Sequence, residues 1–372
     1  MAILARTEAE VVAAVQWARA HKRNVEIAGA RTKRHMTYSR YQGPVLDLSR
    51  LAGIVEYQPE EMILTVRPGT KVAEIEACLA EHDQQLGFDP PDWGPLLGAP
   101  ASSGTIGGAV AADVCGPGAV RYGRVRDHLL GFRAVNGYGE AYKGGGKVVK
   151  NVTGFDLPKL MCGSFGRFGP LTELTLRVFP KPPRQASLAV HGLEDGEGLR
   201  LLRLIHSSPL GATGLAFARG TAWFRFDGTD AALREKLDTA RALLSDHEVS
   251  DGDDAVFRDI GNGTALDAGA RDVWRIHAPP AAAPRIVSAL APARWVADWA
   301  GALLWLATDE ADAEAMRAAV AREGGRMNLM RAMGKAYLHV RRLHPSPPEL
   351  AALEKAVKAA FDPLGLFGSM GF

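Results

Sequence analysis

The sequence predicts an α+β protein of two domains, residues 1–183 and 184–372. In the first part, short predicted strands alternate with helices and glycine-rich turns, whereas the second part is richer in Ala and Leu. Between the two parts Pro180, Pro182 and Pro183 stop the strand pattern, because proline removes a backbone donor and fixes φ. At 372 residues the chain is long enough for more than one hydrophobic core.

The first predicted element is a helix after residue 7. Thr7 is the expected N-cap, and Glu10 three residues later completes a capping box. A strand at 25–27 then leads into the turn Gly29-Ala30-Arg31-Thr32-Lys33, whose two cations suit either a second phosphate loop or an ordinary basic surface turn. The other elements expected before residue 90 are strands at 45–48, 54–57 and 62–66, and a helix with Val72, Ile75 and Leu79 on one face.

A glycine-rich stretch at 98–179 organises the first domain. Asn136-Gly137 predicts a hairpin, Asp156 predicts the cap of a short helix, and the alternation at 174–178 predicts a half-buried strand. Glycine allows positive φ and a close approach of backbone N–H groups to a ligand. The stretch therefore predicts a backbone cradle for a phosphate-bearing cofactor, and a tightly turned β domain with glycine corners remains an equal alternative at this point.

The second domain is predicted to contain two similar halves in one antiparallel sheet. Each half has the order strand, helix, hairpin, helix. The first half comprises a strand at 185–190, a helix at 197–207, a hairpin at Arg219-Gly220 and a helix at 231–244. The second comprises a strand at 273–277, a helix at 281–290, a hairpin near Gly301 and a helix at 311–322. A last helix is expected at 349–361.

Composition excludes several classes of protein. The 44 basic and 42 acidic side chains nearly cancel, so no field attracts nucleic acid. Cys78, Cys115 and Cys162 lack the spacing of a disulfide framework, a zinc site or an iron–sulfur cluster. Neither a signal peptide nor an apolar run long enough for a membrane helix is found. We expect a cytoplasmic protein, which could still lie at the inner membrane through partner subunits.

The standard catalytic and nucleotide motifs are missing. The sequence has no P-loop, no G-x-G-x-x-G after a first strand, no G-x-S-x-G and no H-E-x-x-H. Two glycine loops remain, GARTK and SSGTIGGAV, and they suit a protein whose large cofactor performs the redox chemistry. Ser103, Thr105 and the 106–108 backbone are predicted to meet a pyrophosphate, and Ile106 and Tyr122 to lie near a flavin ring.

Two stretches resemble the FAD-binding domain of the vanillyl-alcohol-oxidase (PCMH-type) flavoproteins: TIGGAVAADVCGPGAVRYGRVRDHLLGFRAVNGYGE and KNVTGFDLPKLMCGSFGRFGPLTELTLRVFPKP. The chain length, the early loop and the DPxG ending resemble the small FAD-binding subunits of bacterial glycolate oxidases. The resemblance implies a PCMH-type FAD-binding domain of two α+β subdomains and an α+β cap-type domain with an antiparallel sheet. It also implies two partners, a larger FAD-containing subunit and an iron–sulfur subunit.

The resemblance also implies which residues hold the cofactor. Those expected to do so are Gly29, Ala30, Arg31, Thr32 and Lys33, then Ser103, Gly104, Thr105, Ile106, Gly107 and Gly108, then Gly116, Tyr122 and Gly123, and finally Gly154, Phe155, Asp156 and Leu157. No histidine lies in either loop, so FAD is expected to be non-covalent. We expect no metal site and assign no catalytic side chain.

Three departures from the family pattern bear on function. The early loop keeps only Gly29 of the usual glycine run, and the ending after Asp362 loses the family's Asn and Arg. Relatives that oxidise 2-hydroxy acids unaided carry a histidine-rich metal block, of which residues 334–339 retain little. We therefore expect an FAD subunit that relays electrons from glycolate oxidation. The alternatives are a self-sufficient FAD-dependent 2-hydroxy-acid oxidase or dehydrogenase, and a flavin-independent assembly subunit.

Overall fold

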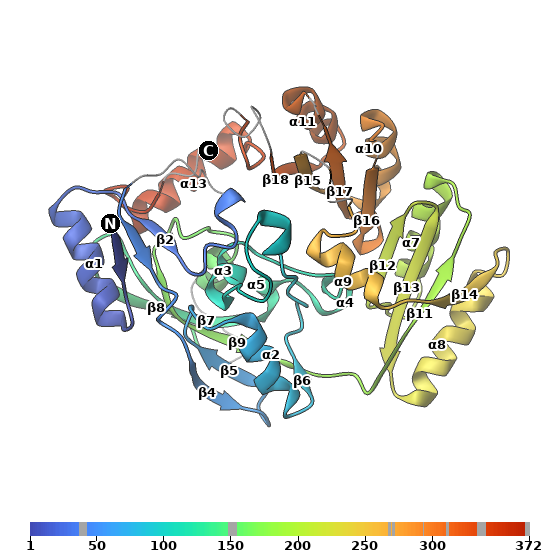
Figure 1. The fold of residues 1–372 in the computed structure, drawn as a ribbon, viewed down its shortest axis with the longest axis horizontal. Helices are drawn as coiled ribbons and strands as arrows, with labels where there is room; N and C mark the ends of the chain where they lie inside the picture. Colours follow the sequence, from blue (N-terminus) through green and yellow to red (C-terminus); the bar gives the residue numbers. More distant parts are fainter. Residues whose placement is uncertain are drawn as a thin grey trace. The chain divides into compact units, whose positions relative to one another are not determined.

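The computed structural model describes residues 1–36, 43–147, 155–266, 269, 272–292, 294–309, 312–332 and 340–368. It divides into two compact units (Figure 1). The first unit contains Met1–Cys115, Gly123–Lys181 and Pro345–Phe372, and the second contains Gly116–Tyr122 and Pro182–His344. The sequence predicts two domains that follow one another in the chain, 1–183 and 184–372, whereas each compact unit combines separate segments. The predicted domain boundaries stay a prediction.

The first unit begins with a small parallel sheet that packs on a helix. Its strand order is β1 (Ala2–Leu4), β3 (Val45–Asp47), β2 (Glu26–Ala28). The buried side chains of α1 (Glu8–Ala20) share a hydrophobic core with this sheet. The predicted capping box is confirmed, because the Thr7 side chain accepts from the Glu10 N–H at 3.2 Å and Glu10 accepts from the Thr7 N–H at 3.2 Å. β2 ends at Ala28, so the first glycine loop starts at the end of this strand.

A second, antiparallel sheet carries most of the other strands of the first unit. Its order is β4 (Ile54–Gln58), β5 (Ile63–Val66), β9 (Leu171–Arg177), β7 (Leu129–Val135), β8 (Ala141–Gly145), with α2 (Val72–Ala80) after β5. The hairpin predicted at Asn136-Gly137 is confirmed as the β7–β8 turn. Asn136 Oδ1 accepts from the N–H groups of Tyr138 at 2.9 Å and Glu140 at 3.0 Å, which closes the loop.

Short helices occupy part of the glycine-rich stretch, and of these only the one after Asp156 is predicted from the sequence. They are α3 (Ile106–Ala111), α4 (Ala119–Tyr122), α5 (Val125–His128) and α6 (Leu157–Met161). Glycine is a poor helix former, so α3 depends on its surroundings. Thr105 caps it, and Gly107 packs so closely that an added Cβ would lie 2.6 Å from Pro68 Cβ. At α6 the predicted cap is confirmed, with Asp156 accepting from the Lys159 N–H at 3.2 Å.

The C-terminal segment returns to the first unit beside β2. Lys358, on α13 (Pro348–Phe361), donates to buried Asp362 at 2.8 Å, to Phe367 O at 3.0 Å and to Arg167 O at 3.2 Å. The Asp362 carboxylate also accepts the N–H groups of Leu366 and Phe367, each at 2.8 Å. The Val25 N–H, next to β2, donates to Leu366 O at 2.7 Å. The DPLGLF ending therefore braces the strand that leads into the first glycine loop.

The second unit contains one antiparallel sheet, as predicted, and this sheet has eight strands. Its strand order is β14-β11-β13-β12-β16-β17-β15-β18, so the two halves meet where Phe217 of β12 pairs with Ala297 of β16. The order within each half mirrors that of the other, which confirms the predicted repeat. The strands are β11 (Arg184–Val190), β12 (Gly214–Ala218), β13 (Thr221–Gly228), β14 (Val249–Gly252), β15 (Asp272–His277), β16 (Arg294–Asp298), β17 (Leu303–Thr308) and β18 (Arg326–Arg331).

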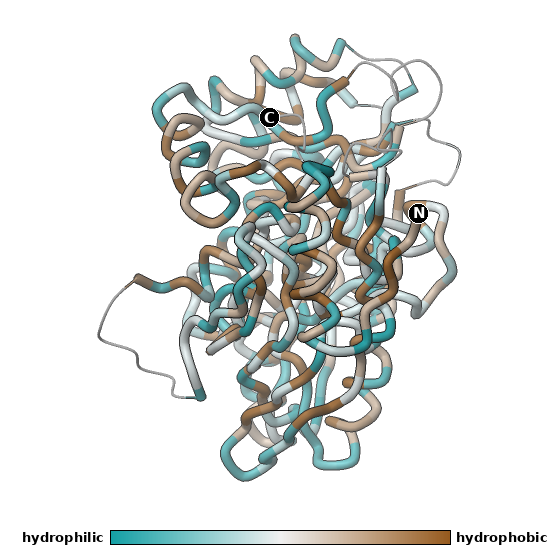
Figure 2. The backbone as a smooth tube through the Cα atoms, turned by 90° about the vertical axis from the view of Figure 1, so that its left-hand side faces the viewer, coloured by the Kyte–Doolittle hydropathy of each residue, from teal (hydrophilic) through white to brown (hydrophobic). Residues whose placement is uncertain are grey.

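Helices of both halves share one hydrophobic core with the sheet. They are α7 (Asp195–Ser207), α8 (Asp230–Leu243), α10 (Ala283–Leu290) and α11 (Ala313–Arg322), and α9 (Ala255–Asn262) follows β14. In Figure 2 hydrophobic and hydrophilic stretches alternate along the chain, as expected of strands and helices with one buried side. None of the helices in the described ranges combines the length and the apolar run needed to cross a bilayer.

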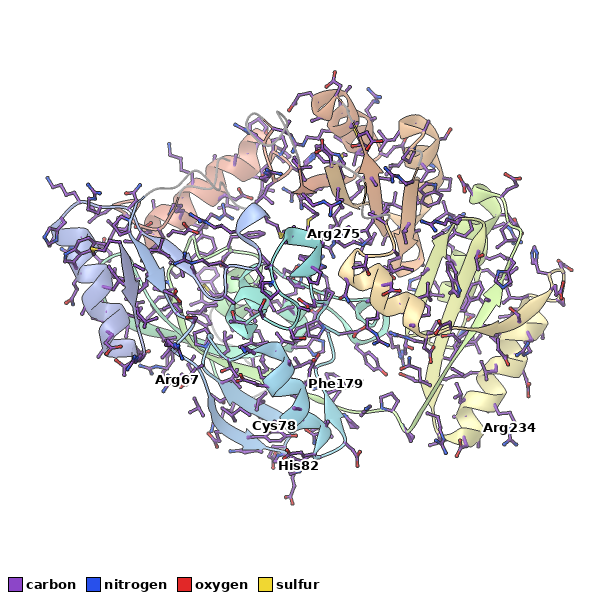
Figure 3. The ribbon with its side chains drawn as sticks, in the orientation of Figure 1. Arg67, Cys78, His82, Phe179, Arg234 and Arg275 are labelled. Carbon is purple, nitrogen blue, oxygen red and sulfur yellow. The ribbon has the colours of Figure 1, made fainter. Side chains whose placement is uncertain are left out.

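The sheet face away from this core carries an aromatic and cationic cluster. Trp274 and Ile276 of β15 point into the core, so the alternating residues Arg275 and His277 face the other side. Arg275, labelled in Figure 3, lies with its Cζ 5.5 Å from the ring centroids of both Trp299 and Trp305. Trp299 and Ala300, in the turn after β16, have left-handed φ values of 51° and 57°.

Candidate cofactor site

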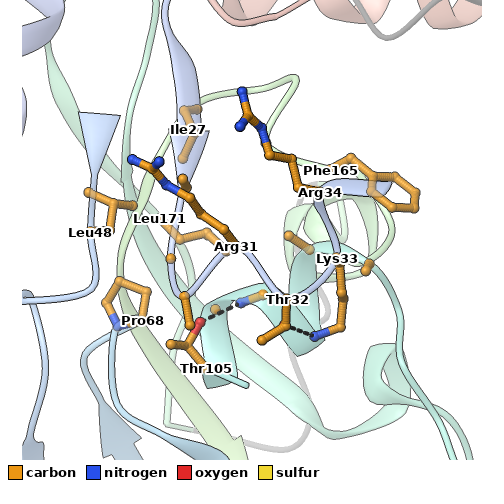
Figure 4. A pocket seen from close by; sticks show the side chains of 18 of the residues that line it. Ile27, Arg31, Thr32, Lys33, Arg34, Leu48, Pro68, Thr105, Phe165 and Leu171 are labelled. Carbon is orange, nitrogen blue, oxygen red and sulfur yellow. Dashed lines mark hydrogen bonds between the residues drawn. The ribbon is translucent and has the colours of Figure 1, made fainter. Parts of the chain in front are cut away.

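An open cavity lies in the first unit where the chain leaves β2 (Figure 4). It holds about 840 Å³ of empty space, part of which is open solvent. Its lining residues are 26–34, Leu48, Pro68, Thr105, Gly107, Gly108, Ala111, Ala112, Phe165, Gly166, Gly169 and Leu171. The cavity therefore joins the two predicted glycine loops.

The first glycine loop, residues 29–33, presents backbone donors at this cavity. Within the described ranges, none of its N–H groups donates a hydrogen bond. The Arg34 N–H donates to Arg31 O at 3.2 Å and closes a turn in which Arg31 has a left-handed φ of 59°. Successive N–H groups in such turns form a concave anion site. The loop thus has the donors that a phosphate group requires.

The glycines of the second loop, residues 103–108, suggest backbone donors for a phosphate, but several of these donors already bond within the protein. The N–H of Ile106 donates to Thr70 O at 2.9 Å, that of Gly107 to Pro68 O at 2.9 Å, and that of Gly108 to Thr105 Oγ1 at 3.3 Å. These donors are engaged inside the protein. Of residues 103–105 only Thr105 lines the cavity, so a pyrophosphate contact by Ser103 and Gly104 stays a prediction. Gly107 and Gly108 contribute to the cavity wall.

The loop contains the cations Arg31 and Lys33, and Arg34 follows it. Both arginines have carboxylate partners. Arg31 lies 3.7 Å from Asp47, and Arg34 lies 3.2 Å from Glu26. Lys33 is half-buried, and its Nζ donates to Thr32 Oγ1 at 3.5 Å. Burial lowers the pKa of Lys33 to about 8, and the nearby Asp92 carboxylate partly opposes this shift. The site is cationic at neutral pH and favours an anionic ligand.

Two of the predicted cofactor residues, Gly116 and Tyr122, belong to the second unit. Their hydrogen-bond partners lie more than 100 positions further along the chain. The Trp299 Nε1–H donates to Gly116 O at 3.0 Å, and the Tyr122 hydroxyl donates to Asp227. Burial, then the hydrogen bond to Asp227, raises the pKa of Tyr122. Neither residue lines the cavity. The contribution of both to cofactor binding stays a prediction.

The remaining predicted residues lie outside the cavity wall. Gly123 has a φ of 94° and packs on Asp127. Asp156 is used as the helix cap, Leu157 begins α6, and Phe155 is 92% exposed. Gly154 lies outside the described residues, as does the 334–339 segment that resembles a degenerate histidine block.

One wall of the cavity went unpredicted. It consists of Phe165, Gly166, Gly169 and Leu171, which lead into β9. Gly166 has a φ of 77° and Gly169 of 125°, and a Cβ on Gly169 would lie 2.1 Å from Val135 O. The closely spaced glycines at 163, 166 and 169 were the available signal for this wall.

Comparison with known proteins identifies the family of the chain. A family model described as an FAD binding domain matches residues 1–145, which include both glycine loops. Glycolate oxidase subunit GlcE of Escherichia coli (strain K12) is 34% identical over 283 residues, covering 76% of this chain and 75% of GlcE. The chain belongs to the GlcE family of FAD-linked oxidoreductases.

More distant relatives of the GlcE family share only part of their length with it. The mitochondrial D-lactate dehydrogenase [cytochrome] of Arabidopsis thaliana is 28% identical over 245 residues, which are 61% of this chain and 41% of that enzyme. Among solved structures, p-cresol methylhydroxylase with substrate bound superposes with a TM-score of 0.73 at 14% identity, over 98% of this chain and 86% of that one. This likeness confirms the PCMH-type fold with its antiparallel cap sheet.

The residues of the cavity fit FAD. The N–H groups of the first loop, which donate no hydrogen bond among the described residues, and the cations of this segment suit a pyrophosphate. The walls formed by Pro68, Phe165 and Leu171 suit an aromatic base. Gly29 approaches Thr105 so closely that an added Cβ would lie 2.6 Å from Thr105 Oγ1. Among the described residues no group of His, Cys, Asp and Glu side chains is arranged to hold a metal ion.

Proposed function

We propose that this chain is the FAD-binding subunit of a glycolate oxidase (glycolate dehydrogenase) complex. In that role it handles the electrons released as glycolate is oxidised to glyoxylate and passes them to an iron–sulfur partner. The 34% sequence identity with GlcE, over 76% of this chain, supports the choice of complex. The observation that carries the cofactor part is the loop at 29–33, whose N–H groups donate no hydrogen bond within the described ranges and lie beside the cavity.

When bound, FAD supplies the two-electron redox chemistry. The backbone of residues 29–33 would hold its pyrophosphate, and Lys33 would add a positive charge there. Pro68, Phe165 and Leu171 would pack on an apolar part of the cofactor and keep water from it. Neither glycine loop contains a His or Cys that could bond to the flavin, which supports non-covalent binding.

The partners follow from the same proposal. A chain whose three cysteines lack cluster spacing needs another subunit to carry electrons through iron–sulfur centres. We expect a larger FAD-containing subunit to bind glycolate, and an iron–sulfur subunit to receive the electrons. The complex is expected to be cytoplasmic and to lie at the inner membrane through these partners.

Co-expression with the two partner subunits tests this function. The useful variant is Ala30→Asp, which places a carboxylate in the anion loop, and Ala30→Asn is the control of equal size without charge. We expect the Ala30→Asp complex to assemble, but to lose the flavin of this chain and most glycolate-dependent dye reduction. The Ala30→Asn complex should keep the flavin and the dye reduction. Full activity after loss of this flavin would contradict electron handling and favour an assembly role. Glycolate-dependent dye reduction by this chain alone would favour a self-sufficient oxidase.

A further inference from the structure

The C-terminal end of α1, a helix at one edge of the first unit in Figure 1, carries a cluster of exposed cations. These are Arg19, Lys22 and Arg23, and residues 11–25 contain no Asp or Glu. Within the described part of the chain none of the three forms an ion pair. A cation in the last turn favours the helix dipole, which accounts for Arg19 but not for Lys22 and Arg23, because these follow the helix.

A groove lies beside these cations. It holds about 760 Å³ of empty space, which includes open solvent, and its lining residues are Met1, Trp17, His21, Arg23, Gly43 and Pro44. Met1 is 72% exposed, and the Trp17 ring stacks on the His21 ring with centroids 4.9 Å apart. The groove therefore presents a thioether, an indole and an imidazole next to the guanidinium of Arg23.

The β7–β8 turn lies against the same end of α1. Gln16 Nε2 donates to Gly139 O at 3.3 Å, and Arg19 Nη1 donates to Tyr138 O at 3.2 Å. The Tyr138 side chain is 44% exposed, and the Arg19 Cζ lies 5.9 Å from the centroid of its ring. This turn thus adds an exposed aromatic ring to the cations.

The segment after α13 brings a further apolar side chain to this region. It starts beside the β7–β8 turn, where the Gly137 N–H donates to Phe361 O at 2.8 Å. It then reaches the strand region after α1, where the Val25 N–H donates to Leu366 O at 2.7 Å. Leu364 lies between these two contacts and is 56% exposed. We call the resulting surface the α1 patch, and its members are Met1, Trp17, Arg19, Lys22, Arg23, Tyr138 and Leu364.

The carboxylates next to the α1 patch are engaged elsewhere. Asp362 is buried and pairs with Lys358 at 2.8 Å, and Glu140 accepts from Asn136 Nδ2 at 3.1 Å. The patch therefore keeps its positive charge, although the basic and acidic side chains of the whole chain nearly cancel. A surface of this sign is complementary to phosphate groups.

The composition of the α1 patch favours a lipid surface over a protein partner. Trp and Tyr are enriched at the level of lipid headgroups, because one end of each ring is apolar and the other polar. Cations beside apolar side chains are attracted to anionic lipid by two additive effects, burial of apolar area and neutralisation of phosphate charge. The core of a protein–protein interface is instead depleted of charged residues.

We propose that the α1 patch binds the surface of a bilayer that contains anionic phospholipid. Its cations contact the headgroup phosphates, and its apolar side chains enter the headgroup level without crossing the bilayer. The inference goes beyond the proposed function, in which the complex reaches the membrane through its partner subunits. Because the patch is separate from the cofactor cavity, vesicle binding and flavin content can fail independently.

Flotation of the full chain with lipid vesicles tests this inference. One set of vesicles is pure phosphatidylcholine, and the other contains equal parts of phosphatidylcholine and anionic phosphatidylglycerol. We expect binding to the anionic vesicles only. Binding should weaken as the salt concentration is raised from about 0.1 M to about 0.5 M, because salt screens exposed charges.

A double variant, Lys22→Asn with Arg23→Gln, removes two cations of the α1 patch. Lys22 has a left-handed φ of 49°, which asparagine tolerates. Each cation at an anionic surface contributes about fivefold to the partition coefficient, the equivalent of about 1 kcal/mol, so the double variant should partition about 25-fold less. The control combines Arg234→Gln on α8 with Arg258→Gln on α9, both exposed, and should bind like wild type because it removes the same net charge elsewhere.

A second double variant, Tyr138→Ser with Leu364→Ser, removes apolar side chains and keeps the charge of the α1 patch. It should weaken binding several-fold at low and at high salt alike. Leu243→Ser, at an exposed position of α8, is its control and should bind like wild type. Flavin content and thermal unfolding of every variant should match those of wild type, which shows that weaker vesicle binding does not reflect lost folding.

The outcomes separate this inference from its alternatives. Failure of the wild-type chain to bind anionic vesicles at low salt overturns it. An equal loss of binding in the Arg234→Gln, Arg258→Gln control also overturns it, because binding would then follow net charge alone. Patch variants that bind vesicles like wild type but no longer co-purify with the partner subunits would assign the surface to a protein contact instead. A chain that binds anionic vesicles but no FAD supports this inference and contradicts the proposed function.

Discussion

The Trp299 indole N–H donates to the carbonyl oxygen of Gly116 at 3.0 Å, across 183 positions of sequence. Gly116 is buried, and Trp299 adopts the left-handed backbone that lets its ring reach this carbonyl. Trp299→Phe keeps most of the ring packing but leaves a buried acceptor without this donor. We expect it to lower the free energy of unfolding by about 1–3 kcal/mol, measured by urea denaturation. Trp295→Phe, at a half-buried position, is the control and should cost less; equal losses would contradict the role of this bond.

Gly107 is expected to tolerate no side chain. A Cβ there would lie 2.6 Å from Pro68 Cβ and 2.8 Å from Pro68 O, and Pro68 lines the cofactor cavity. Gly107→Ala should lower the free energy of unfolding by about 1–3 kcal/mol, as overpacking does, and should weaken FAD binding. Gly196→Ala in α7, where nothing lies within 4 Å, should be neutral or slightly stabilising. Equal changes in the free energy of unfolding for the two variants would show that contact with Pro68 is not what excludes a side chain at position 107.

Asp362 is expected to tie the C-terminal segment to the first unit. Its side chain is buried against Lys358 and accepts two backbone N–H groups. Asp362→Ala removes these contacts and leaves the ammonium poorly paired, at a cost of about 3 kcal/mol or more. Limited proteolysis should then cut near α13, and FAD affinity should fall because β2 loses its neighbour. Resistance to proteolysis equal to that of wild type would show that other contacts hold this segment.

The cofactor-free protein should gain stability when Lys33 is made neutral. Its folded pKa of about 8 lies below the ordinary value of 10.5, so burying the charged amine costs stability below about pH 8. This cost decreases as pH rises from 8 towards 10.5, because the unfolded chain then holds the extra proton. Lys33→Met should therefore raise the melting temperature at neutral pH, by the equivalent of about 1–3 kcal/mol, and less at high pH. A variant less stable than wild type at neutral pH would contradict this sign.

Local patterns predicted the elements well where short-range chemistry determines them. The capping box at Thr7, the hairpin at Asn136 and the repeated strand–helix order of the second domain follow from neighbouring residues. The site itself depends on contacts far apart in sequence. Nothing near Gly107 indicates that its N–H is taken by Pro68, and nothing near Gly116 indicates that Trp299 binds it. The first glycine loop was recognisable as a candidate from its own residues, and among the described residues its N–H groups donate no hydrogen bond, while its cofactor contacts stay a prediction.

Flavin content tests the central claim most directly. The chain is purified, incubated with FAD, passed through a desalting column and examined by absorbance, and the flavin is then released by acid. We predict about one FAD per chain with the visible absorption of a flavin, released completely by denaturation, and loss of that FAD in Ala30→Asp but not in Ala30→Asn. A folded chain that shows no flavin absorption after this incubation would contradict the account.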